Sequence, residues 1–293
     1  MTQEEAAPRA ASVDYEATLK PASVETPLYL AFFRPAAHRV VEWALPRGIT
    51  ANQLTLASIA TGLAGAAMLS SKSARVRALG GLFGLAYGVL DCADGQLARA
   101  TKTSSRIGRI LDGASDYIVG TATGAALAST FARKHGRAGV LLALGGLASI
   151  VVQGTLFDHA KNRYLSLTQS SYREGDDLAE TLADITRLEA ENGSVVELAL
   201  LRVYALFLRI QSALSRSSEA PPAKLDPLEA KRLADELAPI ARGWAWLGPS
   251  THVALLATFG GFDRVEAYVF LRLVGGNAAA FWLSKSFAAR QGS

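Results

Sequence analysis

The sequence has few charges and almost no cysteine, and each shortage excludes a class of protein. Its 293 residues include one cysteine, Cys92, so no disulfide can form within the chain. Only 19% of the residues are charged and 50% are hydrophobic, a balance that is unusual for a soluble enzyme of this length. The basic residues lie scattered at the ends of apolar stretches, which argues against nucleic acid as a partner. The composition therefore points to a protein that contacts a lipid bilayer.

Long stretches without a formal charge mark the segments that suit the interior of a bilayer. Residues 48–71, 138–157 and 243–262 each provide about 20 such residues, the length that a helix needs to cross the hydrocarbon core. Three further stretches are shortened by charges at or within their ends, namely residues 78–90, 117–131 and 265–284. The sequence therefore predicts an all-α fold, an integral membrane bundle of about six transmembrane helices.

The first 47 residues are predicted to lie outside this bundle. Residues 1–25 are polar and lack the charged-then-apolar pattern of a leader, so we expect a disordered cytoplasmic N-terminal tail. In residues 26–47, apolar side chains recur at helical spacing between Pro35 and Pro46. This spacing is typical of an amphipathic helix in the membrane interface, with Trp43 at the level of the headgroups. An ordinary core helix explains the same spacing equally well.

A polar insert is predicted to interrupt the bundle. The remaining parts are the first four transmembrane helices at 48–164, a helical cytoplasmic insert at 165–240, and the last two transmembrane helices with a C-terminal tail at 241–293. Within the insert, residues 195–214 are apolar enough for a seventh crossing, yet they contain Glu197, Arg202 and Arg209. Those charges favour an interfacial or buried helix of a membrane-attached cap.

Four aspartates stand at the edges of the apolar stretches, within DCADGQLARATKTSSRIGRILDGASD. On a helix, Asp91 and Asp94 share one face, and Asp112 and Asp116 share a face of the following helix. The short link at 101–105 makes these helices antiparallel neighbours, so both acidic faces meet at one membrane surface. Carboxylates that converge in a confined site repel one another unless cations neutralise them, and hard oxygen ligands suit Mg²⁺ or Mn²⁺. Two such ions about 3.5 to 4 Å apart are the usual clamp for displacement at phosphorus.

The spacing of this segment resembles the signature of the CDP-alcohol phosphatidyltransferase family. The match holds at all eight specified positions of Asp91-x-x-Asp94-Gly95-x-x-Ala98-Arg99, eight residues, Gly108, three residues, Asp112, three residues, Asp116. The resemblance extends over residues 43–165. It implies an enzyme of phospholipid biosynthesis, a phosphotransferase that moves a substituted phosphate group from a CDP-linked donor to an alcohol and releases CMP.

The resemblance also implies a role for individual residues. Asp91 and Asp112 would bridge two Mg²⁺ ions, for which Mn²⁺ can substitute. Asp94 would complete the first metal site, and Asp116 would complete the second and serve as the catalytic base. The residues implied to contact the CDP moiety are Asn52, Thr55, Gly95, Ala98, Arg99, Ser105 and Gly108. The sequence departs from the family pattern at Ala51, where a proline is common.

The resemblance leaves two kinds of substrate pair open. The donor is either CDP-diacylglycerol, with glycerol phosphate, serine or an inositol phosphate as acceptor, or a CDP-linked headgroup, with diacylglycerol as acceptor. In both cases we expect a multi-pass protein of the cytoplasmic (inner) membrane, a homodimer in contact with membrane lipids, with its active site facing the cytoplasm. Lys and Arg residues at the ends of the predicted spans favour this orientation only slightly.

Two other functions are compatible with intramembrane aspartates. An intramembrane prenyltransferase also ionises a diphosphate with Mg²⁺, but it needs a second Asp-rich motif on distant helices. The remaining aspartates lack that spacing; they include Asp158, Asp176, Asp177, Asp184 and Asp226. A proton- or cation-coupled carrier usually places ionisable groups near the midplane of broken helices in repeated halves. Here the aspartates gather at one surface and no second copy occurs.

Overall fold

The computed structural model describes residues 15–18, 25–103, 106–168, 178–191, 193–214 and 226–291. Every regular element in these ranges is a helix, which confirms the predicted all-α fold. The first part comprises η1 (Glu16–Thr18), η3 (Tyr29–Phe33), α1 (Arg34–Ala44), η4 (Leu45–Arg47), α2 (Ala51–Leu69), α3 (Ala74–Ala100) and α4 (Arg106–Thr168). The second part comprises α5 (Leu178–Ala190), α6 (Val195–Leu214), α7 (Pro227–Ala245), α8 (Pro249–Gly261), α9 (Val265–Leu271), η5 (Arg272–Gly276) and α10 (Asn277–Gln291).

Two of the described helices are long and apolar enough to cross a membrane: α3, and α4 over residues 118–168. The first, α3, is longer than the predicted span 78–90, because the helix continues through Asp91 and Asp94 to Ala100. The predicted first span, 48–71, corresponds to α2. The count of six crossings stays a prediction.

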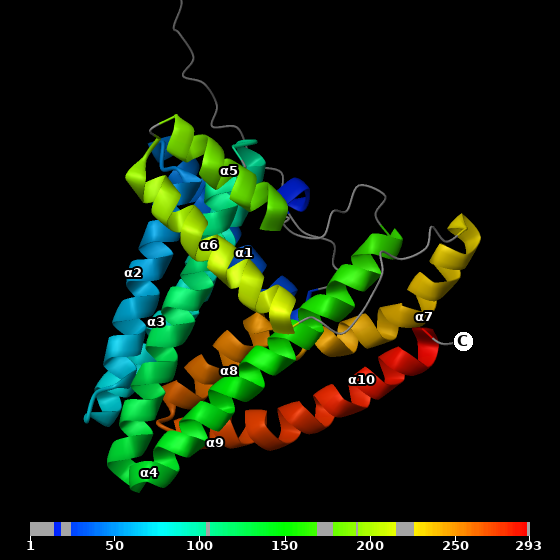
Figure 1. Cartoon of the computed structure of the whole chain (residues 1–293). Coiled ribbons are helices and arrows are strands. Elements are labelled where there is room, and N and C mark those ends of the chain that lie inside the picture. Colours follow the sequence, from blue (N-terminus) through cyan, green and yellow to red (C-terminus); the bar gives the residue numbers. More distant parts are fainter. Residues whose placement is uncertain are drawn as a thin grey trace, which may run out of the picture.

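The long element α4 consists of two arms that meet at Gly136. This glycine has φ 59° and ψ −139°, a conformation that side-chain-bearing residues rarely adopt. A Cβ on the nearby Gly139 would lie 2.1 Å from the carbonyl oxygen of Phe131, so the reversal also requires that no side chain be present there. Figure 1 shows the two arms diverging from this point as a V. The predicted spans 117–131 and 138–157 fall on separate arms.

The predicted fifth span is interrupted in the structure, whereas the predicted sixth span is continuously helical. Residues 243–262 cover the end of α7, a turn at residues 246–248 and all of α8, so no single helix spans them. Residues 265–284 run through α9, the π-helical segment η5 and the first part of α10 without a break. The predicted border of the insert at 240/241 lies inside α7, whose buried face continues from Ala234 to Ala245. Hydropathy alone does not detect the interruption of the fifth span, because the turn Trp246–Gly248 is built from uncharged residues.

One face of α1 packs against the helices that carry the motif. Ala37, Val41 and Ala44 are buried against Cys92 and Leu97 of α3, whereas Trp43 on the opposite face is half exposed. The predicted amphipathic character of residues 26–47 is therefore seen in the burial pattern of α1.

Most of the predicted disordered tail, residues 1–25, lies outside the described residues. Its described part forms a short 3-10 turn, Glu16–Thr18, in which Thr18 is buried. Further along, Glu25 forms a buried ion pair with Arg34 at the start of α1. These contacts place Glu16–Thr18 and Glu25 on the folded body of the protein.

The insert contains two helices that pack against each other, α5 and α6 (Figure 1). Arg202 of α6 donates a 2.7 Å hydrogen bond to Glu189 of α5. On α6, Leu201 and Ala205 are buried, while Val203 and Leu206 remain exposed. Whether residues 195–214 form part of a membrane-attached cap stays a prediction.

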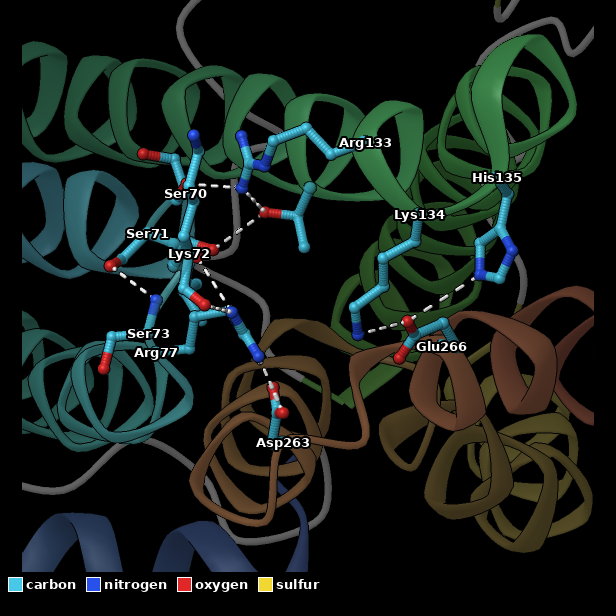
Figure 2. A network of polar contacts seen from close by, with 12 residues as sticks. Ser70, Ser71, Lys72, Ser73, Arg77, Arg133, Lys134, His135, Asp263 and Glu266 are labelled. Atoms are coloured by element: carbon cyan, nitrogen blue, oxygen red, sulfur yellow. Dashed lines mark hydrogen bonds and ion pairs between the residues drawn. The ribbon is translucent and has the colours of Figure 1, made fainter.

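Polar contacts join the α2–α3 turn and the α8–α9 turn at the start of α3 (Figure 2). Arg77 donates a 2.6 Å hydrogen bond from Nε to Asp263 in the α8–α9 turn, and its Nη1 donates to the carbonyls of Ser71 and Lys72. The Arg77 guanidinium holds the pKa of the Asp263 carboxyl below its usual range. Because Arg77 lies in the first turn of α3 and Asp94 lies near its end, two polar clusters flank the apolar middle of this helix.

Glycines allow α3 to approach its neighbours closely, and one of them gives a stability prediction. A Cβ on Gly81 would lie 2.6 Å from the carbonyl oxygen of Ala257 and 2.9 Å from the amide of Gly261, both backbone atoms of α8. We expect Gly81→Ala to cost about 1 to 3 kcal/mol of stability, because α3 and α8 must separate. Thermal unfolding of the purified protein in detergent measures this loss.

Gly84 is the matched control for Gly81. It lies three residues further along α3, and a Cβ there would meet nothing within 4 Å. Gly84→Ala should keep or slightly raise the melting temperature, since alanine favours a helix by about 1 kcal/mol relative to glycine. Equal melting temperatures for the two variants would contradict the close packing of α3 on α8.

Candidate active site

The aspartate motif occupies the last turns of α3 and the first arm of α4, which run side by side. Ser115 of α4 donates a 3.5 Å hydrogen bond to Asp91 of α3, and Tyr87 of α3 donates a 2.6 Å hydrogen bond to Asp116 of α4. The lower-numbered residue of α3 thus meets the higher-numbered residue of α4, so the two segments are antiparallel. This is the arrangement that the short link between the two helices predicts.

Asp94 is held by the helix that precedes the motif. The α2 helix begins with a capping box, in which Thr50 Oγ1 accepts from the Gln53 amide and Gln53 Oε1 accepts from the Thr50 amide. This start places Thr55 one turn further along, where its Oγ1 donates a 2.6 Å hydrogen bond to Asp94 Oδ2. Both residues are buried. Asn52, by contrast, is exposed on the first turn of α2.

The motif face of α3 is the partly exposed one. Asp91, Gly95, Ala98 and Arg99 are partly exposed, whereas the four residues on the other side of these turns are buried, namely Cys92, Ala93, Gln96 and Leu97. Asp94 is the exception among the motif residues, because it is buried together with these four. The part of the motif face that carries Asp91, Gly95, Ala98 and Arg99 is accessible to a ligand.

Arg99 folds back over Gly95. A Cβ on Gly95 would lie 3.3 Å from Arg99 Nη1, so the missing side chain leaves room for the guanidinium. Arg99 Nε donates a 2.7 Å hydrogen bond to the carbonyl of Thr18, and within the described residues Nη2 is buried without a partner. The contact with Thr18 was not foreseen from the sequence, because no motif marks the N-terminal segment.

The other predicted residues lie on the first arm of α4 or on the link before it. Gly108 is partly exposed and Asp116 is exposed. Ser105 lies outside the described residues, and Asp112 lies on α4 with its side chain outside them.

The described carboxylates offer the oxygen donors that a hard divalent cation takes. Asp91, Asp94 and Asp116 come from facing helices, and each accepts a hydrogen bond from a hydroxyl group of a neighbouring helix. Such hydroxyl donors are the usual outer partners that orient a ligating carboxylate. The described side chains, which do not include Asp112, form no group of three His, Cys, Asp or Glu close enough to hold an ion by themselves. The oxygen donors of Asp91, Asp94 and Asp116 are of the kind that a hard divalent cation such as Mg²⁺ takes.

Comparison with known proteins identifies the region that carries this site. The model of the CDP-alcohol phosphatidyltransferase family matches residues 48–173, which contain α2, α3 and α4. Members of this family are membrane-associated transferases of phospholipid biosynthesis that use a CDP-linked donor and an alcohol acceptor, generally with a divalent metal. No curated protein matches the chain significantly.

Proposed function

We propose, from the CDP-alcohol phosphatidyltransferase domain that residues 48–173 form, that this protein transfers a substituted phosphate group from a CDP-linked donor to an alcohol with Mg²⁺. The observation that carries the proposal is the antiparallel contact of the two motif segments, through Ser115 with Asp91 and Tyr87 with Asp116. This contact supports a single site built from both halves of the signature, as the proposed reaction requires.

In the proposed site, Asp91, Asp94, Asp112 and Asp116 hold two Mg²⁺ ions, or Mn²⁺ in their place. The ions would neutralise charge on the pyrophosphate of the donor without a proton transfer. The protein's part is to fix the ligands. The buried hydrogen bond from Thr55 orients Asp94 on α3.

Asp116 acts as the base in this proposal. It takes the proton from the acceptor hydroxyl as the oxygen attacks phosphorus; the bond to the new oxygen forms and the bond to CMP breaks. Its exposure supports this role, because an acceptor must reach the carboxylate. Asp94 is less suited, since it is buried against Thr55.

The CDP moiety is proposed to lie along the accessible face of α3. Arg99 would bind a phosphate oxygen, and its buried Nη2 without a described partner supports that assignment. The other proposed contacts are Asn52, Gly95, Ala98, Ser105 and Gly108. Thr55 is not included among these contacts, because its hydroxyl donates a hydrogen bond to Asp94. We propose that Thr55 holds that carboxylate in position.

We also propose that the protein is a homodimer with several membrane crossings, placed in the cytoplasmic membrane with the site facing the cytoplasm. Two helices suit a crossing by length and composition, and the apolar middle of α3 separates two polar clusters. The donor is CDP-diacylglycerol or a CDP-linked headgroup.

A panel of donors and acceptors tests the function. Purified protein is incubated with Mg²⁺, a radiolabelled CDP-diacylglycerol or CDP-headgroup, and one alcohol at a time, and CMP release and the lipid product are scored. We expect CMP from one class of donor only, and none when EDTA removes the metal. If no pair releases CMP, the proposal is wrong; diphosphate release from an isoprenoid diphosphate would then indicate a prenyltransferase, and uptake into vesicles a cation-coupled carrier.

A further inference from the structure

Tyr87 is an aromatic residue of α3 that the family signature does not include. It lies four residues before Asp91, one helical turn further from the link that joins α3 to α4. Its hydroxyl donates a 2.6 Å hydrogen bond to Oδ1 of Asp116, and 6% of the residue is exposed. The face of α3 that carries Asp91 thus also carries the buried phenol of Tyr87.

Three helices hold the Tyr87 ring in place. A Cβ on Gly62 of α2 would lie 3.1 Å from Cδ2 of Tyr87 and 2.6 Å from Cγ1 of Val119 on α4. The absence of a side chain on Gly62 therefore gives room to both neighbours, and the ring lies among α2, α3 and α4. A tyrosine packed on all sides loses little further freedom when its hydroxyl donates a hydrogen bond.

The bond from Tyr87 matches the one that Thr55 makes. Thr55 on α2 donates to Asp94 on α3, and Tyr87 on α3 donates to Asp116 on α4, each over 2.6 Å. In both cases a hydroxyl from the preceding helix holds one oxygen of a motif carboxylate. For Asp94 both partners are buried, whereas Asp116 is exposed and Tyr87 holds it from the buried side.

We propose that Tyr87 is a positioning residue for Asp116: its hydroxyl fixes the rotation of the carboxylate, so that the group presents a constant geometry to a divalent metal and to the acceptor hydroxyl. This inference rests on the proposed function. Tyr87 keeps its proton throughout and does not touch the donor. Loss of such an outer partner typically costs about 10- to 100-fold in metal affinity or activity.

The test compares Tyr87→Phe with Tyr268→Phe. Tyr268 is the matched control, because it is also fully buried in the bundle and its hydroxyl also contacts a side chain, that of His252, but it lies on α9. Three quantities are measured for each variant: Mn²⁺ affinity by electron paramagnetic resonance, the rise in melting temperature caused by Mg²⁺, and kcat and KM for the CDP-linked donor. The rise in melting temperature is taken against each variant's own metal-free value, so differences in basal stability cancel.

For Tyr87→Phe we expect metal affinity or kcat to fall about 10- to 100-fold, with KM for the donor within about twofold of the wild type. Tyr268→Phe should change none of these ratios. In the Asp116→Asn background, Tyr87→Phe should have no further effect on metal affinity, since the carboxylate through which it acts is gone.

Wild-type metal affinity and kcat in Tyr87→Phe would overturn the inference, as would an equal loss in Tyr268→Phe or an undiminished effect in the Asp116→Asn background. These results are distinct from failure of the proposed function. In that case the wild-type protein itself would release no CMP from any donor.

Discussion

Asp116→Asn is expected to lower the rate of CMP release by about 10²- to 10⁴-fold, because the amide cannot accept the proton of the attacking hydroxyl. The variant should still fold and bind the CDP-linked donor, since Asp116 is exposed and the packing around it, including Tyr87, stays in place. Single-turnover CMP release and equilibrium binding of the donor separate the two effects.

Asp158→Asn is the control for this variant. Asp158 also lies on α4, is partly exposed and pairs with Lys161 at 2.6 Å, but it lies on the second arm, outside the motif. It should turn over at the wild-type rate. Normal transfer by Asp116→Asn would exclude Asp116 as the base, and recovery of the rate at high Mg²⁺ would mean that the residue acts as a metal ligand alone.

Asp91→Ala is expected to abolish Mg²⁺-dependent turnover, a loss of about 10³-fold or more. Metal ions contribute several kcal/mol of charge stabilisation in such reactions, and about 1.4 kcal/mol corresponds to a factor of ten in rate. In the proposed site Asp91 would help to hold both ions, so its removal would weaken the binding of both. The measurements are the Mg²⁺ dependence of CMP release and the rise in melting temperature that Mg²⁺ causes.

Ser115→Ala provides the comparison for Asp91→Ala. It removes the 3.5 Å hydrogen bond to Asp91 and leaves the carboxylate in place. This long contact should matter little, so we expect Ser115→Ala to keep its Mg²⁺ dependence within a few-fold of the wild type. An unchanged Mg²⁺ titration in Asp91→Ala would contradict the two-metal site.

Most of the helices could be predicted from hydropathy and charge, but the turns between them could not. The change of direction in α4 falls where charged residues interrupt two apolar stretches, and Gly136 supplies the backbone conformation. The uncharged stretch 243–262 reads as one helix by composition, yet it contains the turn between α7 and α8. Hydropathy measures whether a segment tolerates an apolar environment, not whether its backbone continues as a helix.

In the site, the sequence predicts which residues share a face of one helix, but it does not predict contacts between residues of different helices. The spacing of Asp91 and Asp94 predicts that they share a face; in the structure Asp91 accepts a hydrogen bond from Ser115 of α4, and Asp94 accepts one from Thr55 of α2. Thr55 was expected to contact CDP, but its hydroxyl donates to Asp94. Tyr87 was not singled out, although its place four residues before Asp91 puts it on the same face of the helix. A tyrosine in an apolar stretch is ordinarily a packing residue, so only the hydrogen bond to Asp116 indicates the role of Tyr87.

The sequence by itself determined the helical class, the apolar segments and the signature from Asp91 to Asp116, because each depends on composition or on the helical period along one segment. Only the tertiary structure decided that Thr55 supports Asp94, that Tyr87 donates to Asp116 and that Thr18 contacts Arg99. The last contact joins residues 81 positions apart in the chain. Such contacts depend on how separate helices pack against one another, and the periodicity of one helix carries no information about the side chain that faces it from another.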